Sequence, residues 1–237
     1  MENINKKYAL YAGISIFIMA IAAGFSFGYV HGNLIVEGDV MSTFVKIKDS
    51  ESLFIIGIIG WILIMICDII VSVLLFNYLR NISKSISLYT ASMRIVYSII
   101  LGLAIYQLIL VLPNLRENAV VGSPRVWLLL DSFIKIWSAG LIIFGIHLLG
   151  LGYLSYLSGF IPKIITFLLL FAGLCYFAIH LAKATLPSYG LYIGVLENVF
   201  SLPMALGELV FAFWLIAKGD KTNNLISGNS HIEDEVQ

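Results

Sequence analysis

The sequence has few charged residues, and this shortage excludes several classes of protein. Of its 237 residues, 12% are charged and 60% are apolar, whereas a soluble domain carries roughly twice that charged fraction. The formal net charge is zero and no basic run is present, which argues against a nucleic-acid partner. The composition predicts a membrane-embedded chain without a separate soluble domain.

Several motifs of catalytic and cofactor-binding proteins are also missing. The sequence contains no His-Glu-x-x-His zinc motif and no Gly-x-Gly-Asp motif of intramembrane aspartyl proteases. No glycine-rich phosphate loop is present, so ATP is not expected to drive this chain. The two cysteines, Cys67 and Cys175, lie inside apolar runs and are interpreted as core residues. We therefore predict neither a cofactor nor a metal site.

Six apolar runs are long enough to cross a bilayer, which requires about 20 residues for a core of about 30 Å. We predict an all-α polytopic transmembrane bundle over residues 1–218. The expected spans are 8–30, 53–79, 87–112, 126–150, 162–183 and 191–217, followed by a polar, disordered tail at 219–237. The first run resembles a signal peptide, but its apolar stretch continues past Ala20-Ile21-Ala22, so an uncleaved span is expected.

The segments between the spans predict one further helix and an orientation. Val40, Phe44 and Ile47 repeat at helical spacing behind Asp39, a suitable N-cap, so a short interfacial helix should separate the first two spans. Polar or aromatic connections are expected at 114–125, closed by Pro124, and at 151–161. Six crossings place both termini on one side.

Basic residues are slightly more numerous on the side of the termini. That side has seven Lys and Arg, namely Lys6, Lys7, Arg80, Lys84, Lys163, Lys218 and Lys221. The other side has five, namely Lys46, Lys48, Arg116, Arg125 and Lys183. This bias favours cytoplasmic termini in a plasma membrane.

The last span carries two carboxylates in a segment where unpaired charges are costly. Glu197, Ser201, Met204 and Glu208 follow one another at helical spacing and form a stripe on one face. Pro203 interrupts this stripe and predicts a kink. Acids at such depth normally face partners, cavities or water.

A rise of about 1.5 Å per residue predicts that the buried charges form two layers. The inner layer should contain Asp68, Arg94, His147 and Glu208. The outer layer should contain Asp131, Lys135, His180 and Glu197. Asp131 and Lys135 lie four residues apart with the acid first, which favours a pair within one helix. Tyr97, one turn after Arg94, completes the candidate binding residues, for which packing alone is the competing role.

Each predicted layer holds one permanent cation and two acids. If every acid were ionised, each layer would be net negative in a medium of low dielectric constant. Such a site must keep one carboxyl protonated, admit water or bind a cation. The hypothesis is that Glu208 or Glu197 stays protonated or takes part in cation binding.

Three kinds of function fit this pattern. The leading one is a membrane protein whose polar interior binds or passes a small solute, a proton or a cation. The second is an intramembrane enzyme acting on lipid, with Asp68, His147 and Glu208 as acid–base or metal groups. The third is a membrane sensor or accessory subunit whose buried charges only specify helix packing.

Several segments in a fixed order resemble one membrane family. They are Gly38-Asp39 with Thr43, Ser50-Glu51-Ser52-Leu53-Phe54, Cys67-Asp68, Arg94, His147-Leu148-Leu149, Gly152-Tyr153-Leu154, Ser158-Gly159-Phe160-Ile161-Pro162-Lys163, Ala172-Gly173-Leu174, Gly207-Glu208, Trp214-Leu215 and Lys218-Gly219. Together they resemble the bacterial family described as domain of unknown function 4386. The turn Arg80-Asn81-Ile82-Ser83 departs from the Arg/Lys-Pro-Val-Asn typical of that family. The resemblance implies a multi-pass bacterial plasma-membrane protein and carries no established activity.

Overall fold

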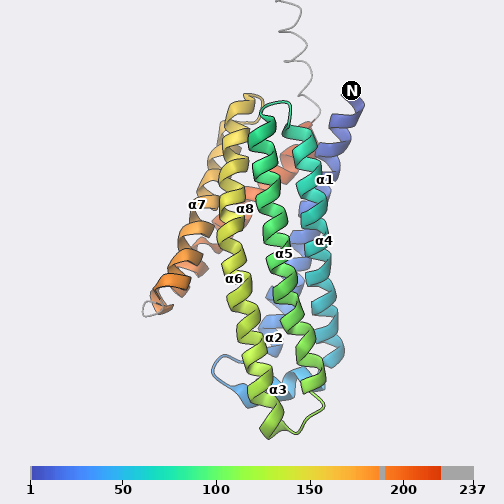
Figure 1. Cartoon of the computed structure of the whole chain (residues 1–237), viewed down its shortest axis with the longest axis vertical. Coiled ribbons are helices and arrows are strands. Elements are labelled where there is room, and N and C mark those ends of the chain that lie inside the picture. The colour runs from blue at the N-terminus through green and yellow to red at the C-terminus, as the bar shows by residue number, and fades with distance from the viewer. Residues whose placement is uncertain (1, 187–189, 220–237) are drawn as a thin grey trace, which may run out of the picture.

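The computed structural model describes residues 2–186 and 190–219, which form helices joined by short turns (Figure 1). The elements are α1 (Glu2–Ala23), the π-helix η1 (Gly24–His31), α2 (Gly32–Leu34), α3 (Val40–Asp49), α4 (Glu51–Leu79), α5 (Lys84–Asn114), α6 (Ala119–Ser158), α7 (Lys163–Thr185) and α8 (Gly190–Lys218). The described residues contain no β-strand. Residues 187–189, between the fifth and sixth spans, and the predicted tail from residue 220 onward lie outside the described part of the chain.

Within the described residues, six helical segments are long and apolar enough to cross a membrane. They cover Asn5–Leu34, Glu51–Leu79, Lys84–Asn114, Ala119–Ser158, Lys163–Thr185 and Tyr192–Lys218. This confirms the predicted all-α membrane bundle. The first segment is longer than expected because η1 and α2 continue α1 without a break.

The six spans follow one another around a ring. Contacts join α1 to α4, α4 to α5, α5 to α6, α6 to α7 and α7 to α8, and α8 returns to α1. At this closing contact the end of α8 meets the first half of α1, because Gly219 lies against Ala9. The Gly219 carbonyl also accepts a hydrogen bond from the Tyr78 hydroxyl of α4 at 3.1 Å. We call this the near end of the bundle, and the end that carries α3 the far end (Figure 1).

The short helix predicted between the first two spans is α3, and Asp39 is its N-cap. The Oδ1 atom of Asp39 accepts a hydrogen bond from the Ser42 amide at 2.9 Å, and Oδ2 accepts one from the Ser42 hydroxyl at 2.6 Å. These bonds favour the ionised carboxyl and lower the pKa of Asp39. Phe44 packs against Gly122 of α6, so α3 covers the far end.

The expected bounds of the fourth span are too short. We predicted 126–150, whereas α6 runs from Ala119 to Ser158, so most of both expected connections is helical. Pro124 does not end the helix, because it lies near an exposed terminus where water can replace the lost hydrogen bond. The helix ends at Gly159, whose φ of 69° suits glycine. Similarly, α8 continues through Pro203.

The apolar core of the described residues has two parts. The main cluster includes residues of every span, and at the near end it holds Leu169 of α7 and Phe211 of α8. The far halves of α7 and α8 form a separate small cluster around Ile179, Ile193 and Met204. In Figure 1 these far halves lean away from the other helices.

Candidate functional site

Arg94 lies fully buried on α5, and side chains from three other helices accept its hydrogen bonds. Its Nε and Nη2 atoms each lie 2.8 Å from Asp68 Oδ1 on α4. Its Nη1 atom donates to Glu208 Oε1 on α8 at 2.9 Å and lies 3.0 Å from His147 Nε2 on α6. The structure thus brings together the four residues expected in the inner layer, which we call the Arg94 cluster.

All five N–H donors of the Arg94 guanidinium have an acceptor in place. Besides the bonds to Asp68, Glu208 and His147, Nη2 lies 3.9 Å from the sulfur of Met19 on α1. The Arg94 Cζ atom also lies 5.3 Å from the centre of the Phe144 ring, a cation–π distance. Arg94 therefore connects helices that are distant in sequence, and a further anion could bind it only by displacing a present partner.

The bonds of His147 define its protonation state. Its Nδ1 atom lies 2.9 Å from the carbonyl oxygen of Thr90, which can only accept a hydrogen bond. Its Nε2 atom faces Arg94, which can only donate. His147 must therefore be the neutral tautomer that carries its proton on Nδ1. Both nitrogens are engaged, so neither is free to bind a metal or act as a base in this arrangement.

The formal charge of the Arg94 cluster is unbalanced. One guanidinium faces two carboxyl groups, and with neutral His147 the sum is one negative charge when both acids are ionised. The Asp68 side chain is 1% exposed and the Glu208 side chain 16%. The second oxygen of Asp68, Oδ2, is buried without a hydrogen-bond partner. An unbalanced charge is costly at such depth, so a proton or another positive group is needed.

A small, mainly apolar hollow lies beside the cluster on its near side. Its volume is about 10 Å³, and its polar lining consists of Ser72, Ser87, Thr90 and His147. The Thr90 hydroxyl is buried without a partner. The hollow is close to the smallest volume that holds one water molecule, so water there would complete the bonding of Thr90.

Tyr97 packs behind the cluster against Trp137 and Phe144. Its hydroxyl accepts a hydrogen bond from Trp137 Nε1 at 3.3 Å. Its ring lies 4.9 Å from that of Phe144, the residue that also contacts Arg94. The geometry gives Tyr97 a packing role around Arg94, and a direct binding role stays a prediction.

The expected outer layer does not form as a single group. Asp131 and Lys135 make the predicted pair within α6, at 2.6 Å, but their side chains are 40% and 74% exposed. Glu197 instead pairs with Lys183 of α7. The grouping was wrong because depth along a span does not reveal which face of α6 a residue occupies.

Contacts between α6 and α7 place these exposed charges at one level of the bundle. Ser138 Oγ lies 2.8 Å from His180 Nδ1. Because α6 and α7 are antiparallel, Lys135 is then level with the last turn of α7, where Lys183 lies. With 40 residues, α6 is about 60 Å long, about twice the hydrocarbon thickness. Asp131 and Lys135 therefore lie in the half of α6 that is nearer the far end of the bundle.

Sequence reasoning missed several partners of the candidate residues. Thr90 and Phe144 could have been predicted from helical spacing. Thr90 lies one turn before Arg94, and Phe144 lies three residues before His147, so each shares a helix face with a candidate residue. Lys183 was visible as a basic residue at the end of its span. Met19 and Ser138 had no signal, because nothing in the local pattern distinguishes them from other residues of a membrane helix.

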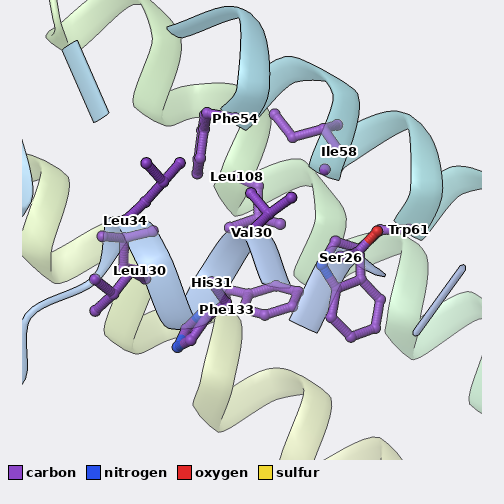
Figure 2. Close-up of a pocket in the computed structure, with 12 residues that line it drawn as sticks. Ser26, Val30, His31, Leu34, Phe54, Ile58, Trp61, Leu108, Leu130 and Phe133 are labelled. Atoms are coloured by element: carbon purple, nitrogen blue, oxygen red, sulfur yellow. The ribbon is translucent and has the colours of Figure 1, made fainter. Parts of the chain in front are cut away.

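A second cavity, of about 20 Å³, lies toward the far end between η1, α4, α5 and α6 (Figure 2). Its lining is apolar except for Ser26, whose hydroxyl is buried without a partner, and His31. Ser26 belongs to the run Gly24-Phe25-Ser26-Phe27-Gly28, which matches the nucleophile motif Gly-x-Ser-x-Gly. The run is a π-helix rather than a strand-to-helix turn, and Figure 2 shows Ser26 and His31 pointing to different sides. The motif therefore lacks a Ser–His pair.

The fold and the buried cluster define a polytopic membrane protein whose helices enclose paired charges. The chain belongs to the family "Domain of unknown function (DUF4386)", whose model matches residues 11–219. It is similar to an uncharacterized protein of Archaeoglobus fulgidus, with 34% identity over 173 residues that cover 73% of this chain and 90% of that protein. No solved structure matches the chain. This relative is archaeal.

Proposed function

We propose that this protein binds a proton on Glu208 in the Arg94 cluster and passes it across the bilayer. The observation that carries the proposal is that Asp68 and Glu208 share one guanidinium beside a neutral His147. Protonation of one carboxyl makes this group neutral, which removes the cost of an unbalanced buried charge. Proton relays within membranes are built from such acids and histidines.

A proton suits this arrangement better than a larger cation. The Arg94 guanidinium already lies between the two carboxyl groups, at the position that a bound cation would take. The adjoining hollow, about 10 Å³ in volume, offers room for about one water molecule. A proton requires no added volume, so it can bind without displacing Arg94.

Glu208 is the better candidate for proton exchange than Asp68. Asp68 accepts two close contacts from Arg94 through one oxygen and is 1% exposed. Glu208 accepts one hydrogen bond from Nη1 and is 16% exposed, so its carboxyl can gain a proton while Asp68 stays paired. The basic bias at the near end supports a cytoplasmic near end in a plasma membrane as part of this proposal.

Infrared spectroscopy and a flux measurement test the proposal together. In infrared spectra, purified wild-type protein should show a protonated carboxyl band that Glu208→Gln removes. In liposomes with a pH-sensitive dye inside, a potassium diffusion potential should drive proton entry through wild type. Glu208→Gln should reduce entry to the rate of protein-free vesicles, whereas Glu117→Gln, in the exposed pair with Arg125, should not. An ionised Glu208 together with no proton entry would overturn the proposal.

A further inference from the structure

Helices α7 and α8 carry a second group of titratable side chains toward the far end of the bundle. Lys183 of α7 and Glu197 of α8 form an ion pair, and both side chains are about a third exposed. His180, one turn before Lys183, is 2% exposed and bonded to Ser138 of α6 at 2.8 Å. The group therefore extends from a half-exposed ion pair to a buried imidazole.

Tyr176 lies between this group and the Arg94 cluster. Its ring stacks on that of His180, with centres 6.1 Å apart and planes 14° apart. On its other side the Tyr176 ring lies 5.3 Å from that of Phe144, which contacts Arg94. Glu197 and Glu208 are eleven residues apart on α8, so about 16 Å separates them along the helix axis.

We propose that His180, with Glu197 and Lys183, is the far-side proton-exchange site that supplies Glu208 along the α7–α8 interface. This inference rests on the proposed proton binding at Glu208 and adds the route of entry. The charged and titratable groups around His180 are Lys183 and Tyr176 on α7 and Glu197 on α8; α6 contributes the hydroxyl of Ser138. Asp131 and Lys135 of α6 are exposed at the same level.

The transfer conserves protons at each step. Glu197, which is about a third exposed, takes a proton from water on the far side and passes it to the buried His180, which becomes an imidazolium next to the Glu197 carboxylate. The Tyr176 hydroxyl then gives its proton to the Glu208 carboxylate, which forms a new O–H bond on Glu208. At the same time the tyrosine oxygen receives a proton from the His180 imidazolium. The net result is a neutral histidine, an intact tyrosine and a protonated Glu208.

The packing around this route favours side-chain movement there. The far halves of α7 and α8 pack on each other through the small cluster of Ile179, Ile193 and Met204, separately from the main core. The described polar contact between α6 and this part of α7 is the Ser138–His180 hydrogen bond. Few buried contacts mean low local stability, so small adjustments that bring proton donor and acceptor together cost little here.

Proton entry into liposomes under a potassium diffusion potential, applied from the far side, tests the route. His180→Gln keeps a group that can bond Ser138 but cannot carry a proton, so entry should fall to the rate of protein-free vesicles. Glu197→Gln should slow entry, and Tyr176→Phe should do the same. The matched control is His31→Gln, which changes another far-half imidazole on η1 and should leave entry unchanged. Thermal unfolding of each variant identifies any that fail to fold, and Ser138→Ala with His180 retained then serves as the milder change, which should slow entry.

The outcomes separate the two proposals. If Glu208→Gln abolishes entry while folded His180→Gln and Glu197→Gln conduct like wild type, the far-side route is wrong and proton binding at Glu208 stands. If Glu208→Gln has no effect on entry or on the carboxyl band, the proposed function fails first. Nitrogen-15 resonance of labelled histidines gives an independent check, because His180 should titrate with pH whereas His147 should keep its single neutral tautomer.

Discussion

The Arg94 cluster and the Asp131–Lys135 pair use the same kinds of side chain in opposite surroundings. Arg94 is fully buried and bonds side chains on α4, α6 and α8, so it connects parts of the chain up to 114 residues apart. Asp131 and Lys135 are largely exposed and connect two neighbouring turns of α6. Of these two groups, the enclosed Arg94 cluster can therefore specify how the helices of the bundle pack, whereas the pair within α6 cannot.

Helix packing shows the same contrast between the near and far parts of α7 and α8. Midway along α7, Gly145 of α6 and Gly173 of α7 bring the two backbones together, because an added Cβ on Gly145 would lie 2.6 Å from the Phe177 nitrogen. Near the far end of α8, an added Cβ on Gly194 would meet no atom within 4 Å. Helices α6 and α7 are thus held by close backbone contact at Gly145 and Gly173, whereas α8 has free space at Gly194.

The largest expected effect follows removal of the buried guanidinium. Arg94→Met would leave Asp68 and Glu208 facing each other without a cation, and we expect a loss of about 3–5 kcal/mol in unfolding free energy. Denaturant-induced unfolding in micelles, followed by circular dichroism, measures it. Lys135→Met is the control for the loss of one positive charge at an exposed site. Equal losses in the two variants would show that burial of Arg94 has no energetic consequence.

A smaller effect is expected from filling the two glycine positions. Gly145→Ala forces its methyl group against the backbone of α7, which should cost about 1–3 kcal/mol. Gly194→Ala meets no neighbour and removes a flexible residue from a helix, so it should raise stability by up to about 1 kcal/mol. The same unfolding measurement on both variants tests the contrast. If Gly145→Ala were as stable as wild type, α6 and α7 would have to move apart at this contact without loss of stability.

The sequence was sufficient to predict the buried Arg94 cluster. It was insufficient to predict how the charged residues nearer the far end are paired. Hydropathy and length predict the spans, and depth along each span predicts that Asp68, Arg94, His147 and Glu208 meet. That reasoning works because a charge in the bilayer core must find a partner at its own depth. It fails for Asp131 and Lys135, because an exposed pair needs no partner on another helix.

The ends of α6 could not be predicted from the sequence either. Proline and aromatic residues near both ends of α6 suggested loops, but helix geometry tolerates a proline close to an exposed terminus. The lean of α7 and α8 away from the bundle also had no sequence signal, because lipid-facing and helix-facing residues in these spans are equally apolar. Tertiary contacts, rather than local pattern, decide both features.

The exposed pair on α6 should contribute little to stability. Lys135→Ala removes a pair at spacing i, i+4, for which about 0.3–0.5 kcal/mol is expected. The contribution should shrink as salt is raised, because exposed charges are screened. Unfolding at low and high ionic strength, with wild type as reference, measures both quantities. A loss independent of salt would indicate that Lys135 acts through packing of its aliphatic stem and not through its charge.

The smallest expected effect concerns Asp39, where pH should act on α3 alone. The Ser42 bonds lower the folded-state pKa of Asp39 below its unfolded value, so the cap is fully effective above the unfolded pKa and is lost as pH falls through the folded pKa. Amide hydrogen exchange in α3 should therefore speed up at low pH in wild type beyond the intrinsic pH dependence. Asp39→Asn keeps an acceptor without a titrating proton and should not show this excess, whereas Asp39→Ala should exchange fast at every pH. Because α3 lies outside the spans, neither Asp39 variant should alter the pH dependence of proton entry. If either variant did alter it, the group that controls proton entry would lie at the far surface and not on α7 and α8.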